Sequence, residues 1–177
     1  AGGSDDHGGI SIRQGTFTNL IVKGNVSTAN GDNQPGLLLS SNSLTSAVIA
    51  NNVLTGNPGA GIALSNVNRG NLVIFENKIE SNSAGVVMSG GTAGTLNLSG
   101  NWWGSLDPAV VAAQVQTNMD YTPWLNSGAD QETETPGFQA DLSVVWVDDD
   151  SPQAGSVDRI QEAADMVEGS TVNILDG

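Results

Sequence analysis

The sequence predicts an all-β solenoid: a right-handed, single-stranded parallel β-helix of about four coils, with three strands per coil and short capping helices. Three observations support this fold class. A glycine and an asparagine recur four times in step, apolar residues between them alternate with period 2, and no helix-period stretch separates the strands. The composition agrees, because 23 glycines and 5% aromatic residues suit a thin structure with many turns.

The two markers define the repeat. Successive glycines are 27, 25 and 24 residues apart, and successive asparagines have the same three separations. Each asparagine therefore lies 16 residues after its glycine, and length varies only between an asparagine and the next glycine. This pattern indicates insertions into one surface turn of each coil. The glycines are Gly9, Gly36, Gly61 and Gly85, and the asparagines are Asn25, Asn52, Asn77 and Asn101.

The repeat frame predicts the interior of the tube. Positions that are equivalent in successive coils should stack about 4.8 Å apart, so apolar residues at one frame position should form a buried column. One column, three residues after each glycine, contains Ile12, Leu39, Leu64 and Met88. A second, thirteen residues after it, contains Val22, Ile49, Ile74 and Leu98.

The asparagines form a predicted structural ladder rather than a ligand site. Stacked Asn25, Asn52, Asn77 and Asn101 can pass amide hydrogen bonds from coil to coil. A second column, Asn30, Asn57 and Asn82, follows five residues later in three copies. Asparagine also tolerates the left-handed conformation of a tight corner.

The fourth copy ends differently, at Asn101-Trp102-Trp103-Gly104. Asp107 and Pro108 are typical of a helix start, which predicts a short helix over 109–115. A solenoid end exposes strand edges and core, so we expect Trp102 and Trp103 to cap it. A sugar-stacking platform is the alternative interpretation of the two tryptophans.

Residues 126–155 are interpreted as an acidic linker with one strand near 142–147. The run Asp148 to Asp150 follows that strand. It lacks the glycine and terminal glutamate of an EF-hand loop, so a solvated acidic turn is the preferred interpretation and Ca²⁺ binding the alternative.

Residues 156–177 predict a helix and a strand that together form a cap. Ser156 is the expected N-cap, and Gly169 the expected C-terminal cap. The expected apolar face contains Ile160, Ala163, Ala164 and Val167, of which Ile160 and Val167 are the candidate capping residues. We expect residues 1–125 to form the coils and closing segment, and the chain to be a fragment of a longer protein.

Composition excludes several function classes. Five Lys and Arg stand against 19 Asp and Glu, for a net charge of −14, which argues against nucleic-acid partners and anionic membrane surfaces. The absence of cysteine excludes disulfides, thiolate zinc sites and iron–sulfur clusters. No apolar stretch is long enough for membrane insertion.

Two segments carry a family resemblance. Residues 159–163 (RIQEA) followed by 169–174 (GSTVNI) resemble the N-terminal cap of pectin-lyase-like right-handed parallel β-helix repeat proteins. Residues 101–104 (NWWG) with 121–125 (YTPWL) resemble the closing segment of β-helix repeats in large bacterial cell-surface, adhesin-like proteins. The resemblance implies an extracellular or cell-surface location. The order here is coils, closing segment, cap, which suggests either a boundary between two solenoids or a cap that covers another copy head to tail.

The family that the chain resembles also includes polysaccharide lyases and hydrolases, so the enzyme hypothesis needs a test. Lyases of this fold use a basic residue with calcium or arginine. Here no two basic residues share a frame position, and His7 lies in an acidic terminus. The basic residues are Arg13, Lys23, Arg69, Lys78 and Arg159. We therefore predict no catalytic and no metal-ligating residues, and no cofactor.

The predicted function is a non-catalytic structural or adhesive β-helix module of a large extracellular surface protein. Expected partners are copies of itself or adjacent β-helix domains arranged head to tail, and glycans. A carbohydrate-binding or degenerate polysaccharide lyase-like domain is the alternative. A glycan array would distinguish the two.

Overall fold

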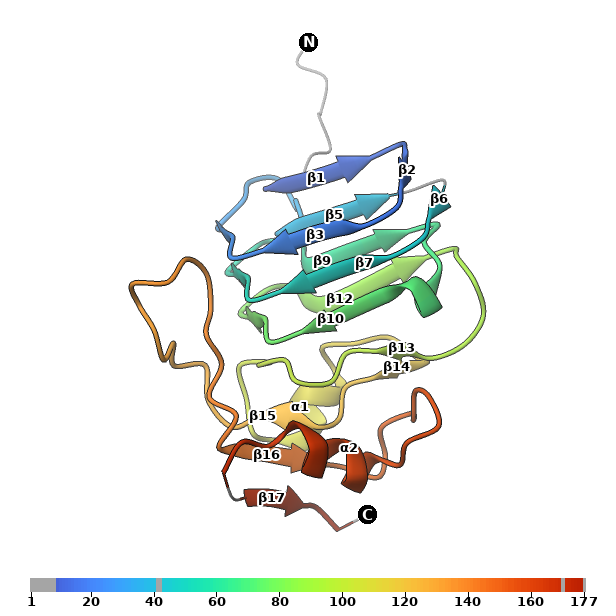
Figure 1. Ribbon diagram of the computed structural model, residues 1–177. Coiled ribbons are helices and arrows are strands. Elements are labelled where there is room, and N and C mark those ends of the chain that lie inside the picture. The colour runs from blue at the N-terminus through green and yellow to red at the C-terminus, as the bar shows by residue number, and fades with distance from the viewer. Residues whose placement is uncertain (1–8, 41–42, 170, 177) are drawn as a thin grey trace.

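The computed structural model describes residues 9–40, 43–169 and 171–176, and these form a parallel β-solenoid (Figure 1). The predicted fold class is confirmed. The tube has about six turns rather than about four. The sequence frame undercounts because the turns after Gly104 lack the glycine and asparagine markers.

Three parallel sheets run along the tube. The first has the order β1-β5-β9-β12, the second contains β3-β7-β10, and the third contains β4-β8-β11. Coils are stacked without slippage, since Leu39 pairs with Ile12 above it and Leu64 below it. The bounds of the first sheet are β1 (Ile10–Arg13), β5 (Leu37–Ser40), β9 (Ala60–Ser65) and β12 (Ala84–Ser89); of the second, β3 (Leu20–Lys23), β7 (Ala47–Ala50) and β10 (Leu72–Phe75); of the third, β4 (Val26–Thr28), β8 (Val53–Thr55) and β11 (Lys78–Glu80).

Short elements complete the coils. The first two coils contain an additional parallel pair, β2 (Thr16–Phe17) with β6 (Ser43–Leu44), and the third has a 3₁₀ turn, η1 (Arg69–Asn71), at that place. The second sheet is continued by the parallel pair β13 (Leu96–Asn97) and β14 (Met119–Asp120).

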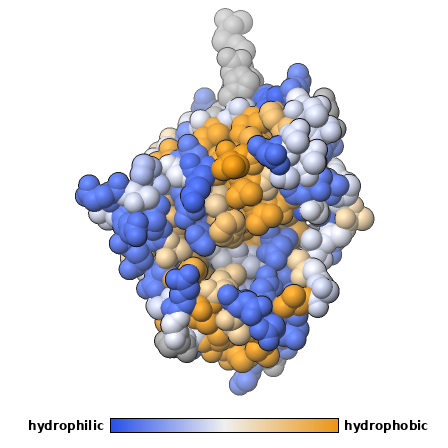
Figure 2. Space-filling model, viewed as in Figure 1, coloured by the Kyte–Doolittle hydropathy of each residue, from blue (hydrophilic) through white to orange (hydrophobic). Residues whose placement is uncertain are grey.

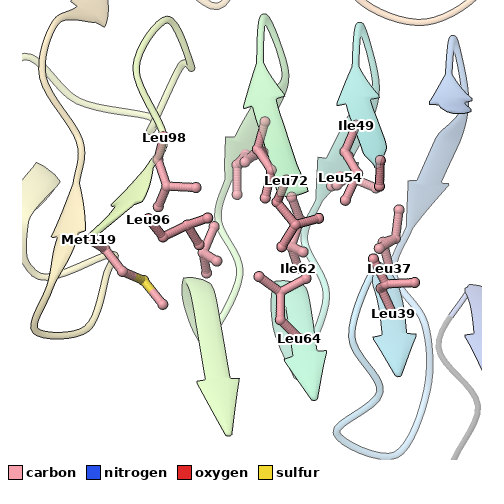
Figure 3. Close-up of a cluster of buried hydrophobic side chains, with 14 of the residues drawn as sticks. Leu37, Leu39, Ile49, Leu54, Ile62, Leu64, Leu72, Leu96, Leu98 and Met119 are labelled. Carbon is pink, nitrogen blue, oxygen red and sulfur yellow. The ribbon is translucent and has the colours of Figure 1, made fainter. Parts of the chain in front are cut away.

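The interior is a continuous stack of aliphatic side chains (Figure 3). Figure 3 shows them projecting from facing strands toward one another in successive layers. Leu37, Leu39, Ile49 and Ile62 are fully buried. Each such side chain contributes about 1.5–3 kcal/mol relative to an exposed one, so the stack is the main source of stability.

The marker glycines allow close contact between coils. A Cβ on Gly61 would lie 2.5 Å from Ile79 Cγ2, and a Cβ on Gly36 would lie 2.8 Å from the carbonyl oxygen of Gly61. At these two glycines the neighbouring coil therefore leaves no room for a side chain.

The tube ends differently from the way it begins. Helix α1 (Pro108–Ala112) starts at Asp107, whose carboxylate accepts a hydrogen bond from Ala109 N. The chain then forms β15 (Trp124–Leu125), which continues the third sheet through a bond from Leu125 N to Asn101 O. Strand β16 (Val144–Val147) pairs antiparallel with β15, and β17 (Thr171–Ile174) pairs parallel with β16.

Residues 126–143 connect β15 to β16 and pack along the outside of the solenoid. Phe138 is fully buried, and its backbone N donates to Asn51 O at 2.9 Å. Asn51 Nδ2 donates in return to Phe138 O at 3.0 Å. Lys78 Nζ donates to Gly128 O at 3.0 Å. We call residues 126–143 the strap, because these contacts hold it against the second and third coils.

Helix α2 (Arg159–Met166) lies between β16 and β17 in the sequence and packs against both. Its N-cap is Asp158, whose side chain accepts from Gln161 N at 3.0 Å, rather than Ser156. An aspartate immediately before the helix satisfies the same orphan N–H groups. The helix contacts the protein through Glu162, Ala163 and Met166, so its buried side is rotated relative to the face expected from sequence.

Candidate functional site

The interior asparagines form two hydrogen-bonded columns. Asn77 Oδ1 accepts from both the backbone N of Asn52 at 3.0 Å and its Nδ2 at 2.9 Å, and Asn101 Oδ1 does the same for Asn77. Asn25 occupies the first position, bound to Asn52 Oδ1. Asn52, Asn77 and Asn101 have no exposed surface. Their polar atoms are saturated by the protein, which leaves none of these amides available to a ligand.

The apolar columns of the sequence frame lie at equivalent register positions. Ile12, Leu39, Leu64 and Met88 pair in succession across β1, β5, β9 and β12. Val22, Ile49 and Ile74 pair across β3, β7 and β10, and Leu98 lies in the same buried cluster. These residues form the core and take no part in a surface site.

The two adjacent tryptophans point in opposite directions. Trp103 is 2% exposed and belongs to the interior cluster. Trp102 lies outside the tube, half-buried beneath Gly128 of the strap, and its Nε1 donates to Glu80 Oε2 at 2.6 Å. With one ring inside and the other covered, the pair does not present two open aromatic faces to a sugar.

The two candidate capping residues of helix α2 also separate. Ile160 is 52% exposed, whereas Val167 packs with the cluster that contains Phe138 and Ala163. Residues two positions apart lie on nearly opposite sides of a helix, so Ile160 points away from the solenoid, which Glu162 contacts.

Two carboxylates, the buried Asp120 and the partly buried Glu162, hold this end of the molecule together. Asp120 has no exposed surface and accepts from Ala154 N at 2.7 Å and Ser151 Oγ at 3.0 Å. Glu162 accepts from Ser99 Oγ at 2.7 Å and Asn97 Nδ2 at 2.9 Å. Burial raises the pKa of Asp120, hydrogen bonds partly oppose this, and the charge of Glu162 adds to it. The pair fastens α2 and the loop before it to the solenoid.

Sequence reasoning did not identify this pair. Asp120 follows an apolar methionine in a short strand, and Glu162 is one of several acidic residues on an amphipathic helix. Neither has a spacing signal, because the two positions come together only through the reversal of the chain after β15.

The triple aspartate does not converge on one point. Asp148 is turned inward, 5% exposed, and its Oδ2 accepts from Tyr121 OH at 3.2 Å. Burial, with the nearby Asp148 charge, raises the pKa of Tyr121. Asp149 and Asp150 are exposed. Within the ranges that the structure describes, no group of three or more His, Cys, Asp or Glu side chains could hold a metal ion.

The basic residues are spread over the molecule. Arg69 Nε donates to Met88 Sδ at 3.2 Å, and Arg159 donates to the backbone oxygens of Asp149 and Ser151. Lys78 forms an ion pair with Glu80 at 3.1 Å. Arg13 and Lys23 lie on separate sheets of the first coil. His7 lies outside the described residues.

A shallow cavity of about 260 Å³ on the outer face of the first sheet is a candidate for ligand contact. It is lined by Arg13, Gln14, Leu38, Ser40 and Ser65. Ser40 and Ser65 are paired in register with Arg13, so hydroxyls and a guanidinium follow one another along the tube axis. This arrangement can donate hydrogen bonds to a polar polymer, but it contains no carboxylate or imidazole for acid–base catalysis.

Among the described residues, no helix is both long and apolar enough to cross a membrane. A family model described as "NosD: Periplasmic copper-binding protein (NosD)" matches residues 3–107, more than half of the chain. Comparisons with curated proteins and with solved structures found no match.

Proposed function

The chain belongs to the NosD family of periplasmic copper-binding proteins, and on this premise we propose that it is a non-catalytic structural module that works outside the cytoplasm. The observation that carries the proposal is the packed interior: an aliphatic stack and hydrogen-bonded asparagine columns fill the tube in the part of the chain that the structure describes. A place at the cell surface, with an adhesive role, is the finer form of the same proposal.

A scaffold role requires a rigid body, and this can be measured. The chain has no cysteine, so a pair of substitutions, Thr28→Cys in the first coil and Glu168→Cys after α2, gives two unique spin labels at exposed positions. Pulsed electron resonance should show one narrow distribution of distances between the two labels in the native protein. In urea the same protein should give a broad distribution. A broad native distribution, or the release of unsaturated products from polyuronates, would contradict the proposal.

Copper requires separate consideration, because the family description names it. Copper prefers thiolate, thioether and imidazole ligands. Met88 contacts Arg69, Met119 is fully buried beside Leu96, and Met166 packs against Gly100. These three thioethers lie in different parts of the fold, and the described residues do not fit a copper site.

We therefore propose that the solenoid described here does not hold copper. Titration with Cu(I) and Cu(II), followed by native mass spectrometry, tests this. The His7→Ala variant serves as the control, because it removes the single imidazole. Stoichiometric copper retained by His7→Ala would contradict the proposal.

The cavity on the first sheet supports a second candidate function, binding of a polar glycan along the tube. Hydroxyl and guanidinium groups at about 4.8 Å intervals suit a chain of hydroxylated rings. A glycan array tests it, with Arg13→Ala expected to abolish any signal that arises from this face and Arg69→Ala as the matched control.

A further inference from the structure

The outer face of the second sheet has an exposed apolar column. Ile21, Val48 and Val73 are register partners in β3, β7 and β10. Ile21 is 68% exposed and Val73 is 52% exposed, and Figure 2 shows an apolar area on this side of the molecule. The residues next to them in the strands, Val22 and Ile74, point inward and are buried. The column therefore lies on the side of the tube, outside a packed sheet.

Farther along the tube, helix α2 covers the same face. Glu162 accepts hydrogen bonds from Asn97 and Ser99, and Met166 lies against Gly100. Because both pairs of contacts advance along the chain together, α2 runs in the same direction as the strands of this sheet, on the side of the tube shown in Figure 1. The face thus has a step: the column on the first three coils lies about one helix diameter, roughly 10 Å, below the outer surface of α2.

The exposed side of α2 matches the column in chemistry and size. Ile160 is 52% exposed, Ala164 lies one turn later on the same side and is exposed, and Val157, just before the helix, is 46% exposed. A helix with its side chains is about 10–12 Å wide. Three coils at a spacing of about 4.8 Å span about 10 Å, so one helix can cover the whole column.

The charges beside the two surfaces are complementary. Lys23, exposed at the end of β3, lies at one end of the strands that carry the column, and Arg69, just before β10, lies at the other. Acidic residues flank α2 in the same way: Asp158 is its N-cap, and Asp165 and Glu168 lie at its end. A net charge of −14 opposes contact between copies in general, so these local charges select the orientation while apolar burial supplies the favourable free energy.

We propose that two copies of this protein pair side by side about a two-fold axis perpendicular to the outer face of the second sheet, so that α2 of each copy covers the apolar column of the other. The axis reverses the direction of the partner's helix, which therefore runs antiparallel to the strands that it covers. This direction brings Asp158 toward Lys23, and Asp165 and Glu168 toward Arg69. The two contacts are identical, so the pair is closed and does not extend further.

The contact that α2 makes within its own chain identifies the partner as a second copy. The outer face of this sheet already packs against α2 in each molecule. In the pair, the two α2 helices lie side by side in one layer between two sheets, so the new contact continues the existing one. The cavity at Arg13 lies on a different sheet, and the inference goes beyond the proposed function without depending on it.

Sedimentation velocity from micromolar to about millimolar concentration tests the proposal, because a contact through one short helix per copy is expected to be weak. Wild type should show monomers and dimers and no larger species. Val73→Asp and Ile160→Asp should each weaken dimerisation by about tenfold or more, since each places a charge in both contacts. Val26→Asp is the matched control: Val26 is 64% exposed but lies on the third sheet, so dimerisation should be unchanged.

An equimolar mixture of Val73→Asp and Ile160→Asp gives a sharper result. The mixed dimer keeps one contact intact, between the normal α2 of the first variant and the normal column of the second. The mixture should therefore dimerise more strongly than either variant alone. A contact between two columns, without α2, predicts no such recovery and would overturn the proposal.

Two charge reversals test the orientation. Lys23→Glu and Arg13→Glu change the net charge by the same amount, and both residues are exposed in the first coil. Only Lys23 lies on the second sheet, so Lys23→Glu should weaken dimerisation several-fold more than Arg13→Glu. Equal effects would show that general repulsion, rather than pairing beside the column, accounts for the change.

The chain has no cysteine, so single thiols can report which residues meet. A mixture of Val48→Cys and Ile160→Cys, treated with a short thiol cross-linker, should give mixed dimers in higher yield than either variant alone. Predominant cross-linking of like variants would contradict the proposal. Monomers at every concentration would overturn it too and leave the column to a different partner, and so would equal weakening by Val26→Asp. None of these outcomes bears on rigidity or catalysis, which test the proposed function separately.

Discussion

Single residues set the spacing of the coils, and asparagine and glycine do so by different means. The asparagine side chain fits the repeat because its acceptor and donor face opposite directions along the tube. Asn77 Nδ2 donates to Asn101 Oδ1 on one side, while its own Oδ1 accepts from Asn52 on the other. An aspartate has no donor, and the single short hydroxyl of serine cannot make the several bonds of the Asn77 amide, so every coil depends on the amide of the next.

We expect Asn77→Ala to lower the free energy of unfolding by about 3 kcal/mol or more, because the buried backbone N–H of Asn52 loses its acceptor and the side-chain bonds to Asn101 and Ile49 are lost. Asn25→Ala should lower the free energy of unfolding by less, since Asn25 is partly exposed at the first coil, where water can replace the lost hydrogen bonds. Urea unfolding of both variants measures the difference. Equal losses would show that the ladder is not a buried network.

The marker glycines act through lack of space. We predict that Gly61→Ala destabilises by about 1–3 kcal/mol, because its Cβ would collide with Ile79 and with the Gly85 carbonyl. Gly31→Ala is the control: nothing lies within 4 Å of its Cβ, so the change should be neutral or slightly stabilising. The midpoints of thermal unfolding compare the two. A neutral Gly61→Ala would refute the steric explanation.

At the scale of elements, the sequence predicted the regular coils better than the closing turns. The coils are predictable because stacking forces equivalent residues into equivalent surroundings, so that each residue type recurs in the sequence. After Gly104 this constraint is absent. The strap is fixed by one buried aromatic residue, Phe138, and α2 by Glu162, and neither contact leaves a period in the sequence. The exposed Ile160 illustrates the same limit, since amphipathic spacing alone did not give the rotation of the helix.

The attachment of α2 should respond to pH through Asp120. Its pKa in the folded protein is raised above 3.8, chiefly by burial. The resulting stabilisation is fully present below the unfolded pKa of 3.8 and is lost as pH rises through the folded pKa. The free energy of unfolding of wild type, measured relative to Asp120→Asn, should therefore be larger at acid pH than at neutral pH. Urea titrations of both proteins across this range measure it.

Measuring wild type relative to Asp120→Asn cancels the contributions of the other carboxylates to the pH dependence, because those groups titrate in both proteins. Asp141 has the opposite shift: hydrogen bonds from Ser143 lower its pKa, so its contribution is lost at acid pH. A relative stability that instead increases toward neutral pH would mean that Asp120 is held as a carboxylate by its hydrogen bonds and that burial does not dominate.

At the scale of the whole molecule, stability reflects a balance between a continuous core and an uneven surface charge. The net charge is −14, and the Lys78–Glu80 pair is partly exposed, with side chains 27% and 26% accessible. Exposed pairs of this kind contribute little, so they do not offset repulsion among the acidic residues. That repulsion is concentrated in the strap and the turns that follow it, where most of the acidic residues lie.

Salt should consequently stabilise the monomer. Raising ionic strength from low to physiological values shortens the screening length to about 8 Å, and we expect the midpoint of thermal unfolding to rise by a few degrees, roughly the effect of 1 kcal/mol in a chain of this size. Glu134→Lys, at an exposed strap position, should raise the midpoint at low salt and reduce its salt dependence. The experiment is best done in dilute solution, where contact between molecules is negligible. A midpoint that falls with salt would show that attractive charge pairs outweigh repulsion within the single chain. In that case the midpoint of Glu134→Lys would depend more steeply on ionic strength than that of wild type.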